Sequence, residues 1–209
     1  MRLILASTSP RRREILALLG LPFDIIAPPF EEQVAPHLSI EDEVLDFAIG
    51  KAESVARTYP DALVIGSDTM ISLAGEKMGK PRDRDDAKRM LAALSGKTHE
   101  IFTAVALLDG ADGRGLRLVE RVFVYMRPST ESEIEDYLNC NESLDKAGAY
   151  SIQGRGEALI DSIRGDYLAA VGMPLKPIAD YLANRGIAFG ESVDRVYAEK
   201  SFLNWQRFS

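Results

Sequence analysis

Residues 3–13, LILASTSPRRR, predict a strand, a turn and the start of a helix in direct succession. The apolar residues form the strand, while Ser9 and Pro10 suit the N-cap and the first position of the helix. A helix begins with partial positive charge and favours acidic residues there, yet three arginines follow. A bound anion would remove this conflict, because free backbone N–H groups and guanidinium groups would both face it. We interpret the segment as a polyphosphate-binding site; the alternative is a solvated basic helix end that pairs with acidic neighbours.

The rest of the chain alternates strand-like with helix-like segments, which is typical of an α/β domain. Two long apolar segments around the turn at 110–113 predict an antiparallel hairpin, so we expect a mixed sheet. The expected strands are 3–5, 23–27, 63–66, 70–73, 101–108, 116–126 and 158–163. The expected helices are 10–19, 40–59, 84–94, 131–138 and 174–183. Residues 191–209 give no clear pattern, although Phe202 and Trp205 suggest docking or a partner surface.

Composition excludes several classes of function. The net charge of −7 argues against general nucleic-acid binding, whereas a local basic patch suits a small anion. A single cysteine, Cys140, excludes an internal disulfide and a thiolate metal cluster. The two histidines, His37 and His99, lack the spacing of metal ligands. No apolar run approaches the length that spans a bilayer, so we expect a cytoplasmic protein without membrane contact.

Neither packing nor capping explains five polar side chains: Glu32, Lys51, Asp68, Lys80 and Gln153. Asp68 follows the predicted strand 63–66, at the end of the sheet where α/β proteins bind ligands. The lysines and arginines could neutralise a triphosphate, and the two carboxylates could hold a divalent cation or activate water. Each residue also has an ordinary alternative as a solvated or turn-forming side chain.

The same residues carry a resemblance to the Maf family of nucleotide pyrophosphatases. The first matching block is LASTSPRR at 5–12, and the others follow in the order of the family. They are 31–32, 51–52, 66–69, 79–81, 94–96, His99, 103–105, 145–150, 152–154 and 171–175.

The resemblance implies an α/β fold with an elongated mixed β-sheet, flanked by helices in two lobes around a deep cleft, similar to inosine triphosphate pyrophosphatase. Residues 1–190 would form this single domain, and 191–209 a C-terminal tail of unknown role. It further implies hydrolysis of nucleoside triphosphates to monophosphate and pyrophosphate with Mg²⁺ or Mn²⁺, a house-cleaning activity, and a homodimer. The proton-accepting aspartate falls on Asp68, which shares the metal with Glu32. The phosphate- and metal-handling positions fall on Ser9, Arg12, Glu32, Lys51 and Lys80.

Three further positions, Arg11, Thr69 and Gln153, resemble the branch of the family that acts on dTTP and UTP. A carboxamide such as that of Gln153 both donates and accepts, which matches the O4 and N3–H edge of uracil or thymine. Two alternatives stay open: a pyrophosphatase of modified purine nucleotides such as 7-methyl-GTP, and a nucleotide-binding regulator of septum formation.

Overall fold

The computed structural model describes residues 2–33, 35, 37–110 and 112–208. The chain folds into two compact units. Unit 1 comprises Met1–Thr69, Thr103–Glu120 and Gly172–Lys200, and unit 2 comprises Met70–Phe102, Arg121–Val171 and Ser201–Ser209.

A mixed sheet is the central element of the fold, and in the described residues it has seven strands in the order β2-β1-β3-β5-β6-β7, with β4 beside β3. The first three strands of this order are parallel, whereas β4 on β3 and β7 on β6 are antiparallel. The strands are β1 (Arg2–Ala6), β2 (Asp24–Ile26), β3 (Ala62–Leu73), β4 (Glu76–Met78), β5 (Thr98–Asp109), β6 (Gly115–Met126) and β7 (Ile160–Arg164). The predicted α/β class and mixed sheet are therefore confirmed. Ala111, in the predicted turn between β5 and β6, lies outside the described residues.

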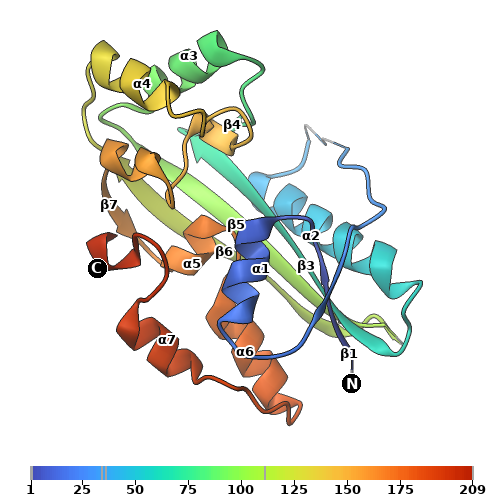
Figure 1. Cartoon of the computed structure of the whole chain (residues 1–209). Coiled ribbons are helices and arrows are strands. Elements are labelled where there is room, and N and C mark those ends of the chain that lie inside the picture. Colours follow the sequence, from blue (N-terminus) through green and yellow to red (C-terminus); the bar gives the residue numbers. More distant parts are fainter. Residues whose placement is uncertain (1, 34, 36, 111, 209) are drawn as a thin grey trace. The chain divides into compact units, whose positions relative to one another are not determined.

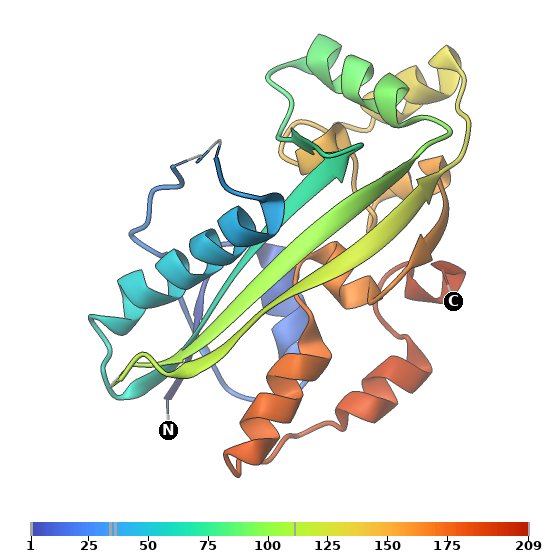
Figure 2. The same ribbon diagram turned by 180° about the vertical axis from the view of Figure 1, so that it is seen from behind.

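Helices cover both faces of the part of the sheet that belongs to unit 1. Figures 1 and 2 show α2 on one face, and α1 and α6 on the other. In unit 2, α3 and α4 lie side by side, joined by an ion pair of 2.7 Å between Arg84 and Glu135. The helices are α1 (Pro10–Ala17), α2 (Ile40–Ala56), α3 (Arg84–Leu94), α4 (Glu131–Leu138), α5 (Tyr167–Val171), α6 (Leu175–Asn184) and α7 (Val193–Glu199). Short 3₁₀ turns are η1 (Ala147–Ala149), η2 (Arg155–Leu159) and η3 (Trp205–Phe208).

The predicted starts of α1, α2 and α4 agree with the structure because each rests on a local capping signal. Ser9 and Ser39 each accept a hydrogen bond from the backbone three residues later, as N-caps do. Thr130 and Glu133 form the complete reciprocal capping box. The first turn of α1 contains no acidic residue, so the conflict of charge read from the sequence is present in the fold.

The structure corrects the prediction that a strand ends at Gly66 and leaves Asp68 behind it. β3 continues through Asp68 and Thr69 to Leu73, so both residues lie within the strand. However, β1 ends at Ala6, which pairs with Gly66. Asp68 therefore extends past the carboxyl end of the parallel neighbour, which is where the sheet rule places ligands.

Several elements that the sequence analysis did not predict are short. β4 follows a tight turn in which Ala74 and Gly75 have φ angles of 53° and 87°, as in a type I′ hairpin. α5 and α7 were also missed, since helices of five and seven residues offer little periodicity. Among the described residues, no helix has the length and apolar character required to cross a bilayer.

Candidate active site

Lys51 bridges two carboxylates in unit 1. Its Nζ atom lies 2.6 Å from Glu32 Oε1 and 2.6 Å from Asp68 Oδ1. The side chains of Lys51 and Asp68 are 10% and 11% exposed, whereas that of Glu32 is 51% exposed. The cluster therefore extends from the interior to the surface, with Glu32 at its solvent end.

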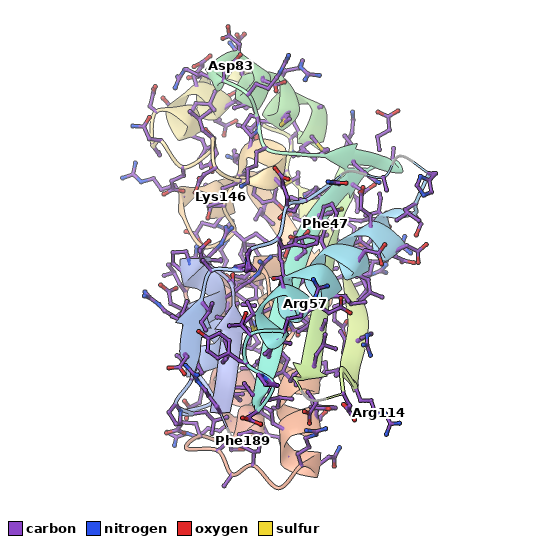
Figure 3. The ribbon with its side chains drawn as sticks, turned by 90° about the vertical axis from the view of Figure 1, so that its right-hand side faces the viewer. Phe47, Arg57, Asp83, Arg114, Lys146 and Phe189 are labelled. Carbon is purple, nitrogen blue, oxygen red and sulfur yellow. The ribbon has the colours of Figure 1, made fainter. Side chains whose placement is uncertain are left out.

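Two glycines allow the close packing that forms this cluster. A Cβ atom on Gly66 would lie 2.2 Å from the Ala48 carbonyl oxygen, so only glycine lets α2 approach β3 this closely. A Cβ atom on Gly50 would lie 2.2 Å from a ring atom of Phe30. Phe30 also meets Phe47 of α2 edge-on, with ring centroids 6.1 Å apart (Figure 3 labels Phe47). The first contact brings Lys51 to Asp68, and the second brings the loop of Glu32 to Lys51.

The opposite face of β3 holds Arg12. Successive side chains of a strand alternate between faces, so Asp68 faces α2 while its neighbour Thr69 faces α1. Arg12 donates from Nη2 to Thr69 Oγ1 at 3.3 Å and from Nε to the Gly172 carbonyl oxygen at 3.1 Å. These two bonds fix the plane of the guanidinium group and leave further N–H groups for a ligand.

β1 ends at Ala6, opposite Gly66, so residues 67–69 of β3 extend beyond it. The charged groups on the two faces of β3 therefore influence one another at this point. Burial raises the pKa of the Asp68 carboxyl, and the positive charges of Lys51 and Arg12 oppose that shift. Burial lowers the pKa of Arg12, while the charge of Asp68 raises it, that of Arg11 lowers it and that of Glu32 raises it. Acidic and basic groups thus converge at the end of β1.

The turn after β1 brings the predicted anion-binding residues to the same place. Ser9 donates its backbone N–H to Ser7 Oγ at 3.1 Å, which holds the turn that precedes α1. Ser9 Oγ in turn accepts from the Arg12 backbone N–H at 3.5 Å. Arg11 and Arg12 are both half-buried, whereas Arg13 is exposed. Ser9, Arg11 and Arg12 therefore share one turn at the N-terminus of α1.

Two predicted site residues belong to unit 2. Lys80 is exposed and follows Gly79, whose carbonyl oxygen accepts a hydrogen bond of 3.1 Å from the Gly148 N–H. Gln153 is half-buried and lies in the loop between η1 and η2. Within unit 1 the structure thus brings Ser9, Arg11, Arg12, Glu32, Lys51, Asp68 and Thr69 together; within unit 2 it places Lys80 and Gln153 on separate segments.

The donor set fits a hard divalent cation. Glu32 Oε1 and Asp68 Oδ1 each lie 2.6 Å from Lys51 Nζ, so the two oxygen atoms are at most twice that distance apart. Lys51 contacts one oxygen of each carboxylate, so each carboxylate has a second oxygen. The described residues contain no group of three or more His, Cys, Asp or Glu side chains able to hold a metal. One or two carboxylates together with substrate phosphates are the usual ligands of Mg²⁺.

Two residues that orient the site, Thr103 and Gly172, were not predicted from the sequence. Thr103 Oγ1 donates to Thr69 Oγ1 at 3.1 Å, and the Gly172 carbonyl oxygen accepts from Ser67 Oγ at 3.1 Å as well as from Arg12. Thr103 and Gly172 both lie in sequence blocks that resemble the Maf family, and this resemblance was the signal that could have identified them. Their contacts join segments far apart in sequence, so no local pattern could reveal them.

Comparison with known proteins assigns the family. The profile described as "Maf-like protein" matches residues 2–185. The chain belongs to the Maf family. The dTTP/UTP pyrophosphatase of Moorella thermoacetica is 46% identical over 186 residues, 89% of this chain and 96% of that relative. The dTTP/UTP pyrophosphatase of Bacillus cereus (strain B4264) is 42% identical over 174 residues, 83% of this chain and 90% of that relative.

Among solved structures, a nucleoside-triphosphatase (dITP/XTP pyrophosphatase) from Mycobacterium abscessus aligns with a TM-score of 0.42 and 17% identity. The alignment covers 89% of this chain and 96% of that one. The predicted membership of the Maf family is confirmed by the profile and the relatives. Residues 186–209 lie beyond the part of the chain that the Maf profile matches.

Proposed function

We propose that this chain hydrolyses dTTP and UTP to the monophosphate and pyrophosphate. The two relatives described above carry that activity in their names, and the chain shares at least 42% of their residues over most of its length. The observation that carries the proposal is the Glu32–Lys51–Asp68 cluster at the end of β1, beside the arginines of α1. Such an arrangement combines a candidate base with the positive charge that phosphoryl transfer requires.

In the proposed reaction, a water molecule attacks the α-phosphorus. The bond from this phosphorus to the bridging oxygen of pyrophosphate breaks, and pyrophosphate leaves. Asp68 accepts the proton of the water, a role that its raised pKa favours because a base works best when its pKa approaches the working pH.

The basic residues offset the negative charge of the triphosphate. The ammonium group of Lys51 has three N–H donors. It donates one to Glu32 and one to Asp68, which leaves the third for a phosphate oxygen. Arg11 and Arg12 would donate to phosphate oxygens at the N-terminus of α1, with the Ser9 hydroxyl beside them. We assign Lys80 to the same task. A divalent cation held by Glu32 and Asp68 would supply further positive charge to the phosphate oxygens.

Base selection falls to Gln153, with Arg11 and Thr69 as the other positions that mark the dTTP/UTP branch. A glutamate at position 153 would instead accept from the N1–H and amino group of guanine. Gln153→Glu should therefore lower kcat/KM for UTP and raise the relative rate with GTP. Steady-state kinetics on both nucleotides measure this change.

The decisive experiment uses purified protein with Mg²⁺ or Mn²⁺ and separate samples of dTTP, UTP, CTP and GTP, with products identified by mass. Monophosphate and pyrophosphate support the proposal, whereas diphosphate and orthophosphate mean attack at a different phosphorus. A wide preference for GTP or 7-methyl-GTP would favour the purine alternative. Binding without repeated turnover would favour a regulator. The homodimer implied by the resemblance stays a prediction, which analytical ultracentrifugation tests.

A further inference from the structure

Residues 201–208, close to the C-terminus, pack against other parts of unit 2 although they lie outside the family profile. Trp205 is buried and stacks on Tyr167, with ring centroids 5.5 Å apart and an interplanar angle of 13°. The Tyr167 hydroxyl donates to the Leu203 carbonyl oxygen at 2.5 Å. Arg207 Nη2 adds a hydrogen bond of 3.2 Å to the Ile160 carbonyl oxygen. The segment is therefore anchored by an aromatic stack and by polar contacts.

Asn204 connects this anchored segment to the loop that carries Gln153. Its side-chain Nδ2 donates to the Ile152 carbonyl oxygen at 3.0 Å and to the Gly154 carbonyl oxygen at 3.3 Å. These carbonyl groups belong to the two residues that flank Gln153. Asn204 itself has a φ angle of 64°, a left-handed conformation that asparagine tolerates better than most residues. Asparagine at this position thus tolerates the left-handed backbone and donates hydrogen bonds to the two carbonyl groups of the loop.

Other residues of unit 2 hold the outer ends of the same loop. The Ser151 N–H donates to Tyr137 Oη at 3.0 Å, and the Arg155 N–H donates to Glu142 Oε2 at 2.8 Å. The side chain of Gln153 makes no hydrogen bond to another residue in the described part of the chain. The direction of its carboxamide therefore depends on the backbone at 152–154, to which Asn204 is bonded on both sides.

We propose that Asn204 is a positioning residue for base selection: it holds the peptide groups around Gln153 so that the carboxamide faces the base of the substrate. This inference rests on the proposed function, because it requires Gln153 to contact the base. It assigns a role to a segment beyond the family profile. Asn204 acts through Gln153 and does not touch the substrate.

The test compares Asn204→Asp and Asn204→Gly with Leu203→Ala, all in the full-length chain. Both Asn204 variants accept a left-handed backbone, but Asp places a negative charge against two carbonyl oxygens and Gly removes the donor. The Leu203 side chain is 60% exposed, and the Ala variant keeps the backbone carbonyl that binds Tyr167. The readout is the ratio of kcat/KM for UTP to that for GTP. A loss of folded protein lowers both values equally, so the ratio reports positioning alone.

We expect the ratio to fall about tenfold in Asn204→Asp, because two hydrogen bonds are lost and a negative charge faces the two carbonyl oxygens. It should fall less in Asn204→Gly, which loses the hydrogen bonds without adding that charge. Leu203→Ala should keep the wild-type ratio. Gln153→Ala, measured in parallel, separates the role of Asn204 from that of Gln153. If Gln153→Ala loses the preference while both Asn204 variants keep it, the role of Asn204 is refuted and the proposed function stands. If the wild type itself shows no preference for UTP, the proposed function fails and the role of Asn204 with it.

Discussion

Replacing Asp68 with Asn should abolish most turnover and leave the fold intact. The change keeps the shape of the side chain and removes the base and its charge. Loss of a general base lowers the rate by about 10² to 10⁴. The stability should change by no more than about 1 kcal/mol, since burial already disfavours the charged carboxyl and an amide oxygen still accepts from Lys51. Lys51 also keeps its contact of 2.6 Å with Glu32.

The assay follows pyrophosphate release from dTTP, and urea unfolding in the presence of EDTA gives the stability. Asp61→Asn serves as the matched control, because Asp61 precedes the same strand and is exposed. Triphosphate should still raise the Tm of Asp68→Asn, since a ligand that binds only the folded state stabilises it by mass action. Turnover close to that of the wild type would remove Asp68 from the mechanism. A loss of several kcal/mol would refute the expectation that the fold tolerates the change.

Three more predictions concern Lys51, Arg12 and His99. Lys51→Met leaves Asp68 as a buried charge without its partner and should lower the free energy of unfolding by about 3 kcal/mol in urea; a loss below 1 kcal/mol would contradict this. Arg12→Lys cannot reproduce the fork to Thr69 and Gly172, so KM for dTTP should rise about tenfold, whereas Arg13→Lys at the exposed neighbour should leave KM unchanged. Burial lowers the pKa of His99 to about 4, so the folded state resists its protonation and stability falls as the pH drops below 6.5. Between pH 7.5 and 5 the loss should be about 2 kcal/mol, and His99→Gln should lack it in urea unfolding; an equal loss in both proteins would refute the assignment.

Local signals in the sequence were sufficient for most elements of the fold. The helices at Ser9, Ser39 and Thr130 begin where their caps indicate, because an N-cap bond spans only three residues. The arginines of α1 also predict an anion site, through a conflict of charge within a single helical turn, and this site stays a prediction. The predicted end of the strand at Gly66 was wrong because the signal used for it was local. Polar residues after a buried strand indicate its end unless partners elsewhere in the fold bind them, and sequence does not show those partners.

The sequence by itself determined the α/β class, the helix starts and the family to which the chain belongs, since these depend on short patterns and on their order along the chain. Only the tertiary structure decided that β3 continues through Asp68, that Lys51 reaches both carboxylates, and that Asn204 holds the loop of Gln153. Each of these depends on contacts between segments distant in sequence. Such contacts require close packing, as at Gly66 beneath α2, and packing is a property of the folded chain as a whole.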